Sequence, residues 1–167
     1  MTRKSLPPRS SRGKPAGSAS SGAHAPAAKQ AALEIYDTTL RDGAQAEDVS
    51  FSAEDKVRVA QQLDGLGVQF IEGGWPGANP KDIEFFRMIK TVPLQTATVV
   101  AFGATRKSSN TVQKDPNILA LLEAETTIIT LFGKTWSLHV TDALGISLVK
   151  NLELISDSVA HLRSKGR

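Results

Sequence analysis

Arg41 and Asp42 are the residues of this sequence whose types and position most favour chemistry. They lie in the motif DTTLRDGAQ, at residues 37–45, where a β-rich run ends. Asp42 offers hard carboxylate oxygens of the kind that Mg²⁺ or Mn²⁺ prefers. Arg41 offers a planar, permanently charged group that can hold a carboxylate or a developing enolate oxygen. A second interpretation stays open, in which Asp42 and Gly43 form a simple turn and Arg41 is an exposed ion-pair partner.

Two further residues are candidates for catalysis or substrate binding. Glu72 ends an apolar run just before the turn sequence GGWPG, where a carboxylate can act as a base, an acid or an orienting partner for Arg41. It could equally be a structural ion-pair residue. His139 could protonate or bind an anionic substrate, although a lone histidine is more often structural. The other histidines are His24 and His161, and none of the three is paired with another.

The elements that must position these residues alternate in type along the chain. Four β-rich runs cover residues 33–38, 68–72, 96–102 and 127–132. Helical patterns lie between them, at intervals of about 30 residues, which is the rhythm of βαβ units. This rhythm predicts a parallel sheet, in which the loops at the carboxyl ends of the strands hold the functional residues.

Local signals predict where the helices begin and end. The start signals combine a capping side chain with an acid or a proline: Ser52 with Asp55, Asn79 with Pro80, and Asp115 with Pro116. Glycines 65, 67 and 166 follow helical patterns and can end them. The last helix carries an apolar stripe that we expect to pack on the sheet, made of Leu148, Leu152, Ile155, Val159 and Leu162.

Residues 1–32 differ in composition from the rest of the chain. They are rich in Ser, Ala, Gly and Pro, contain no acid, and have Leu6 as their single large aliphatic residue. Such a segment buries too little apolar surface to offset its ordering entropy, so we expect a disordered tail. It holds six of the 20 basic residues and none of the 17 acids, so residues 33–167 have a formal charge of −3. The net positive charge of the chain therefore comes from the tail alone. Since residues 33–167 are mildly acidic, we expect no nucleic-acid partner.

Other classes of protein are excluded by composition. The chain has no cysteine, which excludes disulfides and thiolate metal sites. Its apolar runs are far shorter than the roughly 20 residues that cross a membrane. We expect a cytoplasmic protein without a membrane partner. The alternative is an organellar one, if residues 1–32 are a transit peptide, although Pro7 and Pro8 disfavour the amphipathic helix that such peptides form.

Two α/β architectures fit four βα units. An open doubly wound sheet suits a chain of this length, whereas a closed TIM barrel needs eight strands and about 250 residues. The glycines at positions 65, 67, 73 and 74 do not continue into a phosphate-binding fingerprint, so a dinucleotide site is not expected.

The motif at residues 37–45 resembles the first-strand motif of the pyruvate carboxyltransferase family of metal-dependent acyltransferases and lyases. This family includes isopropylmalate synthase, homocitrate synthase and hydroxymethylglutaryl-CoA lyase. Three further segments resemble its citramalate synthase branch: EGGWPGANPKD at 72–82, AFGATR at 101–106 and FGKTWSLHV at 132–140. The resemblance covers residues 33–167. It implies the first four βα units of a TIM (β/α)8 barrel, an N-terminal fragment that lacks the family's later His-x-His metal pair.

For the intact enzyme, the resemblance implies a Claisen condensation of acetyl-CoA with pyruvate to citramalate and CoA, on a route to isoleucine. It also implies a homodimer and a divalent metal, Mg²⁺ or Mn²⁺ with Zn²⁺ as an alternative. The implied residues are Arg41 and Glu72 for catalysis, with Glu72 orienting Arg41, Asp42 for the metal, and Gln45, Asn79, Thr105 and His139 for substrate binding. Two alternatives stay open: another acyltransferase or lyase of the family, and a non-catalytic remnant that completes a barrel with another chain.

Overall fold

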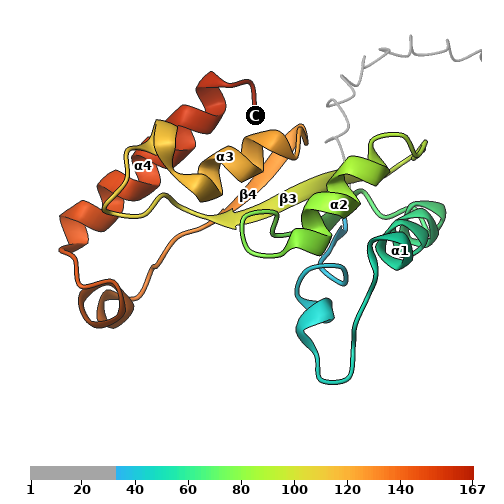
Figure 1. Cartoon of the computed structure of the whole chain (residues 1–167), viewed down its shortest axis with the longest axis horizontal. Helices are drawn as coiled ribbons and strands as arrows, with labels where there is room; N and C mark the ends of the chain where they lie inside the picture. The colour runs from blue at the N-terminus through green and yellow to red at the C-terminus, as the bar shows by residue number, and fades with distance from the viewer. Residues whose placement is uncertain (1–32) are drawn as a thin grey trace, which may run out of the picture. The chain divides into compact units, whose positions relative to one another are not determined.

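A four-stranded parallel sheet lies at the centre of the computed structural model, which describes residues 33–167 (Figure 1). The strands are β1 (Tyr36–Asp37), β2 (Phe70–Gly74), β3 (Thr98–Ala104) and β4 (Ile128–Phe132). Each strand pairs with the next one in sequence, in the order β1-β2-β3-β4. This order is that of consecutive units in a barrel, because a doubly wound sheet reverses its order at a switch point. The disorder predicted for residues 1–32 lies outside the described residues.

Helices alternate with these strands, as predicted. They are α1 (Ala53–Gly65), α2 (Pro80–Ile89), α3 (Pro116–Glu123) and α4 (Leu148–Ser164). Short 3-10 turns at Gly43–Gln45 and Val112–Lys114, and a π-helix at His139–Ala143, lie in the connections. Within residues 33–167, no helix has both the length and the apolar character that a membrane crossing requires.

The predicted caps form at the starts of α1, α2 and α3. Ser52 and Asp55 make a reciprocal capping box at α1. The side chain of Asn79 accepts the N–H of Lys81 at α2, and Asp115 accepts two N–H groups at α3. These side chains take backbone donors that have no partner inside the helix, which is why the helices begin at these residues.

Strands β2 and β3 begin and end two residues later than predicted. At β3 the cause is Asp64, whose carboxylate accepts the N–H groups of residues 95, 96 and 97 at 2.9, 2.8 and 2.7 Å. These three residues therefore bond to a side chain before the sheet begins. At β1, the N–H of Ile35 bonds to the side-chain oxygen of Gln69 at 2.7 Å, and the regular strand covers only Tyr36–Asp37.

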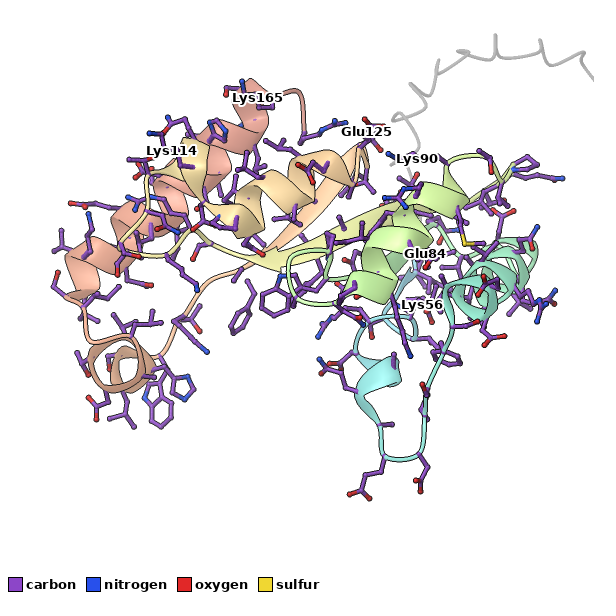
Figure 2. All side chains as sticks on the ribbon, viewed as in Figure 1. Lys56, Glu84, Lys90, Lys114, Glu125 and Lys165 are labelled. Carbon is purple, nitrogen blue, oxygen red and sulfur yellow. The ribbon has the colours of Figure 1, made fainter. Side chains whose placement is uncertain are left out.

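The two faces of the sheet have different roles. One face packs against the helices and forms the hydrophobic core, in which Ile71 and Ala101 from the strands meet Ala60, Phe85 and Leu121 from the helices. Charged side chains lie on the outside of the helices, where Lys90 and Glu125 form an exposed ion pair at 2.8 Å (Figure 2).

The opposite, inner face of the sheet carries the alternate residues of each strand, since side chains of a strand alternate between faces. Tyr36 pairs in register with Phe70, and Glu72 with Val100. The hydroxyl of Tyr36 lies 2.7 Å from the hydroxyl of Thr130 in β4, although two strands separate β1 from β4. The sheet is therefore curved so that its first and last strands approach each other, as in a section of a barrel.

The stripe predicted for α4 is wrong in its orientation except at its last residue, Leu162, which is buried as predicted. Leu148, Leu152 and Val159 are exposed, and Ile155 is half-buried. The buried face consists of Asn151, Leu154, Ser158 and Leu162. Two hydrogen bonds determine which face of α4 is buried. Asn151 donates to the carbonyl of Lys134 at 2.9 Å, and Ser158 accepts the N–H of Arg106 at 3.0 Å. These groups of the loops after β3 and β4 need partners, and α4 turns its polar residues toward them.

Candidate active site

Arg41 is placed by a tight turn at the end of β1. The carbonyl of Thr38 accepts the N–H groups of Arg41, Asp42 and Gly43 at 3.1, 2.8 and 3.1 Å. Asp37 supports the same turn, because its carboxylate accepts the N–H of Thr39 at 2.9 Å. The chain thus reverses immediately after the strand and sets Arg41 at the carboxyl end of the sheet.

The guanidinium of Arg41 is held on three sides. Its Nε donates to Oε1 of Glu72, and its Nη1 donates to Oδ1 of Asp42 at 2.9 Å. Its Cζ lies 4.0 Å from the centroid of the Phe102 ring, a cation–π arrangement. None of the described residues accepts a hydrogen bond from Nη2. Nη2 is therefore the part of Arg41 that can donate to an oxygen of a bound molecule.

Glu72 is a buried carboxylate on the inner face of the sheet, with 2% of its surface exposed. One oxygen accepts from Arg41, and the other accepts from the hydroxyl of Tyr36 at 2.6 Å. Since both oxygens already have donors, the geometry favours an orienting role for Glu72 over proton abstraction.

Asp42 is the most exposed member of this group, with 62% of its side chain accessible. Only its Oδ1 is engaged, by Arg41, so Oδ2 can bind a divalent cation. Within residues 33–167, no group of three or more His, Asp or Glu side chains is arranged to hold a metal ion. Asp42 therefore fits as one ligand of such an ion, and the described residues do not supply the rest of a site.

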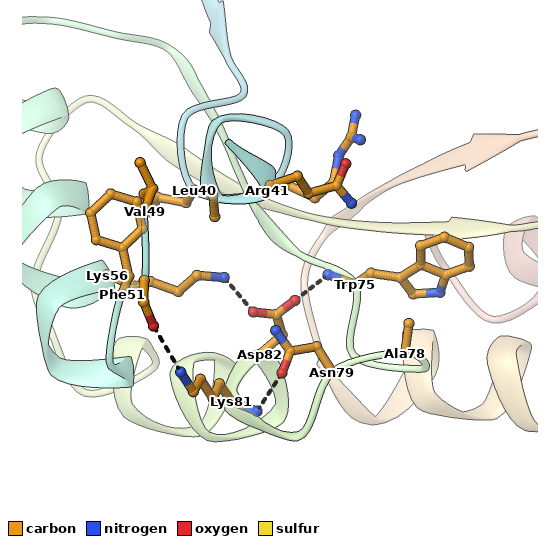
Figure 3. A pocket seen from close by; sticks show the side chains of 13 residues that line it. Leu40, Arg41, Val49, Phe51, Lys56, Trp75, Ala78, Asn79, Lys81 and Asp82 are labelled. Carbon is orange, nitrogen blue, oxygen red and sulfur yellow. Dashed lines mark hydrogen bonds and ion pairs between the residues drawn. The ribbon is translucent and has the colours of Figure 1, made fainter. Parts of the chain in front are cut away.

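A cavity of about 290 Å³ lies beside Arg41, between the loops that precede α1 and α2 (Figure 3). Two residues predicted to bind substrate, Gln45 and Asn79, line it, together with Lys81. The side-chain oxygen of Asn79 is engaged as the cap of α2, at 3.1 Å from the N–H of Lys81. The structure thus brings Gln45 and Asn79 to one cavity with Arg41.

Thr105 and His139 lie elsewhere. Thr105 follows β3, donates its N–H to the carbonyl of Phe132 at 3.2 Å, and lines a second cavity of about 370 Å³ at the ends of β3 and β4. His139 begins the π-helix, is exposed, and packs edge-on against Trp136 with 4.7 Å between ring centroids. It lines neither cavity. Of the predicted residues, Arg41, Asp42 and Glu72 form one cluster that is joined by hydrogen bonds between their side chains.

Sequence reasoning missed several residues that hold this cluster. Tyr36 and Phe102 contact Glu72 and Arg41 from neighbouring strands, and only the alternation of inner-face residues could have indicated them. Lys56 donates to the carbonyl of Gly73, next to Glu72, and does not contact the cluster itself. Its sequence signal is clearer, because it lies on the buried face of α1 with Ala53 and Ala60. A lysine within an apolar stripe is a signal that a buried acid faces it.

Comparisons with known proteins find close relatives in sequence. Residues 32–167 match the family model described as HMGL-like. The (R)-citramalate synthase of Geobacter sulfurreducens is 54% identical over 132 residues, which are 79% of this chain and 25% of that protein. The enzyme of the same name from Synechocystis sp. is 52% identical over 141 residues, 84% of this chain and 26% of that protein. The 2-isopropylmalate synthase of Solidesulfovibrio magneticus is 34% identical over 132 residues, 79% of this chain and 25% of that protein. The chain thus spans about a quarter of the length of these relatives.

Solved structures confirm the partial barrel. The hydroxymethylglutaryl-CoA lyase of Pseudomonas aeruginosa matches with a TM-score of 0.60 at 21% identity, over 80% of this chain and 43% of that one. The lyase of Bacillus subtilis matches with a TM-score of 0.59 at 18% identity, with the same coverage of 80% and 43%. At such identities the likeness concerns the fold alone.

Proposed function

Since the chain belongs to the HMGL-like family, we propose that residues 33–167 are the N-terminal half of the catalytic barrel of a citramalate synthase. The proposed reaction is an acyl transfer, in which acetyl-CoA condenses with pyruvate to give citramalate and CoA on a route to isoleucine. The sequence is more similar to two (R)-citramalate synthases than to a 2-isopropylmalate synthase, which supports pyruvate as the 2-oxo acid. We propose a homodimer for the intact enzyme.

The observation that carries this proposal is the fixed guanidinium of Arg41. The condensation forms a bond between the methyl carbon of acetyl-CoA and the keto carbon of pyruvate, and negative charge develops on the keto oxygen. Glu72 and Asp42 hold Nε and Nη1, so Nη2 is positioned to donate to that oxygen. A cationic donor that is held in place before the reaction stabilises the developing charge without reorganisation.

The remaining steps require other groups. A base must remove a methyl proton from acetyl-CoA, and water must then release CoA from the thioester. We assign Glu72 to neither step, because its two oxygens are engaged by Arg41 and Tyr36. Its proposed role is to orient Arg41.

Asp42 is proposed as one ligand of a divalent cation, Mg²⁺ or Mn²⁺ with Zn²⁺ as the alternative. Such an ion would act as a Lewis acid that polarises the keto group. Gln45 and Asn79, which line the cavity beside Arg41, are proposed to contact the 2-oxo acid. For Thr105 and His139, a role in substrate binding stays a prediction.

A chimera tests the proposed substrates. Residues 33–167 would replace the matching segment of the Geobacter sulfurreducens (R)-citramalate synthase, and product would be measured with acetyl-CoA and either pyruvate or a branched 2-oxo acid. We expect citramalate from pyruvate and little condensation with the branched substrate. A folded chimera that prefers the branched 2-oxo acid, or condenses neither, would contradict the proposal.

A further inference from the structure

Three hydroxyl and carboxylate groups from three different strands meet on the inner face of the sheet. Tyr36 in β1 lies between Glu72 in β2 and Thr130 in β4, at 2.6 and 2.7 Å from its hydroxyl oxygen. The contact with Thr130 exists only because the sheet curves, since β1 and β4 are not neighbours.

The direction of these hydrogen bonds follows from the number of protons. A phenol has one proton, and a carboxylate paired with a guanidinium is an acceptor only. Tyr36 therefore donates to Oε2 of Glu72, which leaves Thr130 to donate to the phenolic oxygen. The two bonds point the same way, and such chains strengthen one another.

Arg41 and Tyr36 together prevent the carboxylate of Glu72 from rotating, which Arg41 alone cannot do. The terminal torsion of a glutamate side chain is broad, so a carboxylate with one partner can rotate. Arg41 binds Oε1 of Glu72, and Tyr36 binds Oε2. With both oxygens held, the plane of the carboxylate is set, and with it the direction in which Nε of Arg41 must point.

We propose that Tyr36 is a positioning residue, whose hydroxyl, held by Thr130, fixes Glu72 and through Glu72 the guanidinium of Arg41. The inference rests on the proposed function, because it assigns Tyr36 a part in setting the donor that faces the keto oxygen. It adds a residue outside the motif that carried the sequence prediction.

The phenol itself supplies a probe, because Tyr36 is the only tyrosine of the chain. Although 40% of Tyr36 is exposed, its partial burial and the hydrogen bond to Glu72 raise the pKa of Tyr36 above its ordinary value, and the charge of Glu72 acts in the same direction. Thr130 and the charge of Arg41 lower the pKa of Tyr36.

The first measurement is an absorbance titration of Tyr36 in the full 167-residue chain. In the wild type the phenol should ionise at a higher pH than free tyrosine, because Glu72 accepts its proton in a hydrogen bond. Glu72→Gln should lower the midpoint by about one pH unit or more, since it removes the negative charge. Adding Thr130→Val to that variant should raise the midpoint again. Thr98→Val removes a hydroxyl from β3 outside the cluster and should change nothing.

The second measurement reports on Arg41 directly, through the exchange of its Nε–H with solvent by NMR. The signal is identified by its loss in Arg41→Lys. Tyr36→Phe should speed the exchange by roughly five- to tenfold, as expected for loss of a hydrogen bond that holds its partner. Should Tyr36→Phe fail to fold, Thr130→Val carries the same test.

Two results would overturn the inference: a phenol that titrates at its ordinary value in the wild type, or an Arg41 signal that Tyr36→Phe and Thr130→Val leave unchanged. Neither signal depends on turnover. If both measurements contradicted the role of Tyr36, the proposed reaction would still stand or fall on the chimera experiment.

Discussion

Lys56 of α1 and Asp82 of α2 form a buried ion pair directly behind the end of β2 (Figure 3). Lys56 also donates to the carbonyl of Gly73 at 3.0 Å, and Asp82 accepts the N–H of Trp75 at 2.8 Å. The pair thus binds the backbone on both sides of Gly74, whose φ of +149° a side chain rarely adopts. The pair therefore holds the backbone of the residues that follow Glu72, from Gly73 to Trp75.

Replacement of Lys56 should therefore be costly. Lys56→Met leaves the carboxylate of Asp82 buried without its cation, and we expect the free energy of unfolding to fall by about 3–5 kcal/mol. Urea denaturation at a fixed protein concentration measures the change. The matched control is Arg58→Met, which breaks an exposed ion pair with Asp55 on the same helix and should cost less than about 1 kcal/mol. Equal losses in the two variants would refute the structural role of Lys56.

Two glycines on neighbouring elements should respond differently to alanine. A Cβ at Gly73 would overlap the ring of Phe85, whereas a Cβ at Gly65 would have no neighbour within 4 Å. Gly73→Ala should destabilise the chain by about 1–3 kcal/mol, as expected for overpacking. Gly65→Ala should leave stability unchanged or increase it by up to about 1 kcal/mol, because Gly65 ends a helix. Thermal melts of both variants measure these changes in stability. A Gly73→Ala variant as stable as the wild type would show that β2 and α2 pack less closely than described.

Asp42 alone should bind metal weakly. One carboxylate cannot compete well with the hydration of a divalent ion, so calorimetric titration of the chain with Mn²⁺ should give a dissociation constant of about a millimolar or weaker. Asp42→Asn should abolish that binding, and Asp48→Asn, a change at an exposed loop acid, should preserve it. Micromolar binding that survives Asp42→Asn would contradict the assignment.

Residues 33–167 produced alone should self-associate. The edges of β1 and β4 present unpaired backbone groups, and Phe132 on β4 is 48% exposed. Phe132→Lys should weaken association, whereas Leu66→Lys, at an exposed residue after α1, should not. Sedimentation velocity at several concentrations is the test. A monomer at every concentration, with a cooperative melt, would show that four units are stable without a partner.

The parts of the fold that could be predicted from sequence depend on local interactions. Ser52, Asn79 and Asp115 act on backbone groups within three residues, so the starts of their helices follow from the sequence. The position of Arg41 and Asp42 after a strand follows in the same way.

What could not be predicted depends on contacts between distant segments. The buried face of α4 is chosen by the partners of Asn151 and Ser158, which belong to loops far away in sequence. Tyr36 meets Thr130 only through the curvature of the sheet. For the same reason, the segments at residues 37–45 and 72–82 predicted Arg41, Asp42 and Glu72 but not Tyr36 and Phe102, which contact Glu72 and Arg41.

We propose that Arg41 acts on the transition state rather than on folding. The most direct test is the turnover of Arg41→Lys in the chimera, since lysine keeps the charge and loses the planar fork. We predict that kcat falls by about 10²- to 10³-fold while the melting temperature is unchanged. Arg87→Lys, at an exposed residue of α2, serves as the control and should keep wild-type turnover. Wild-type turnover in Arg41→Lys would contradict the claim.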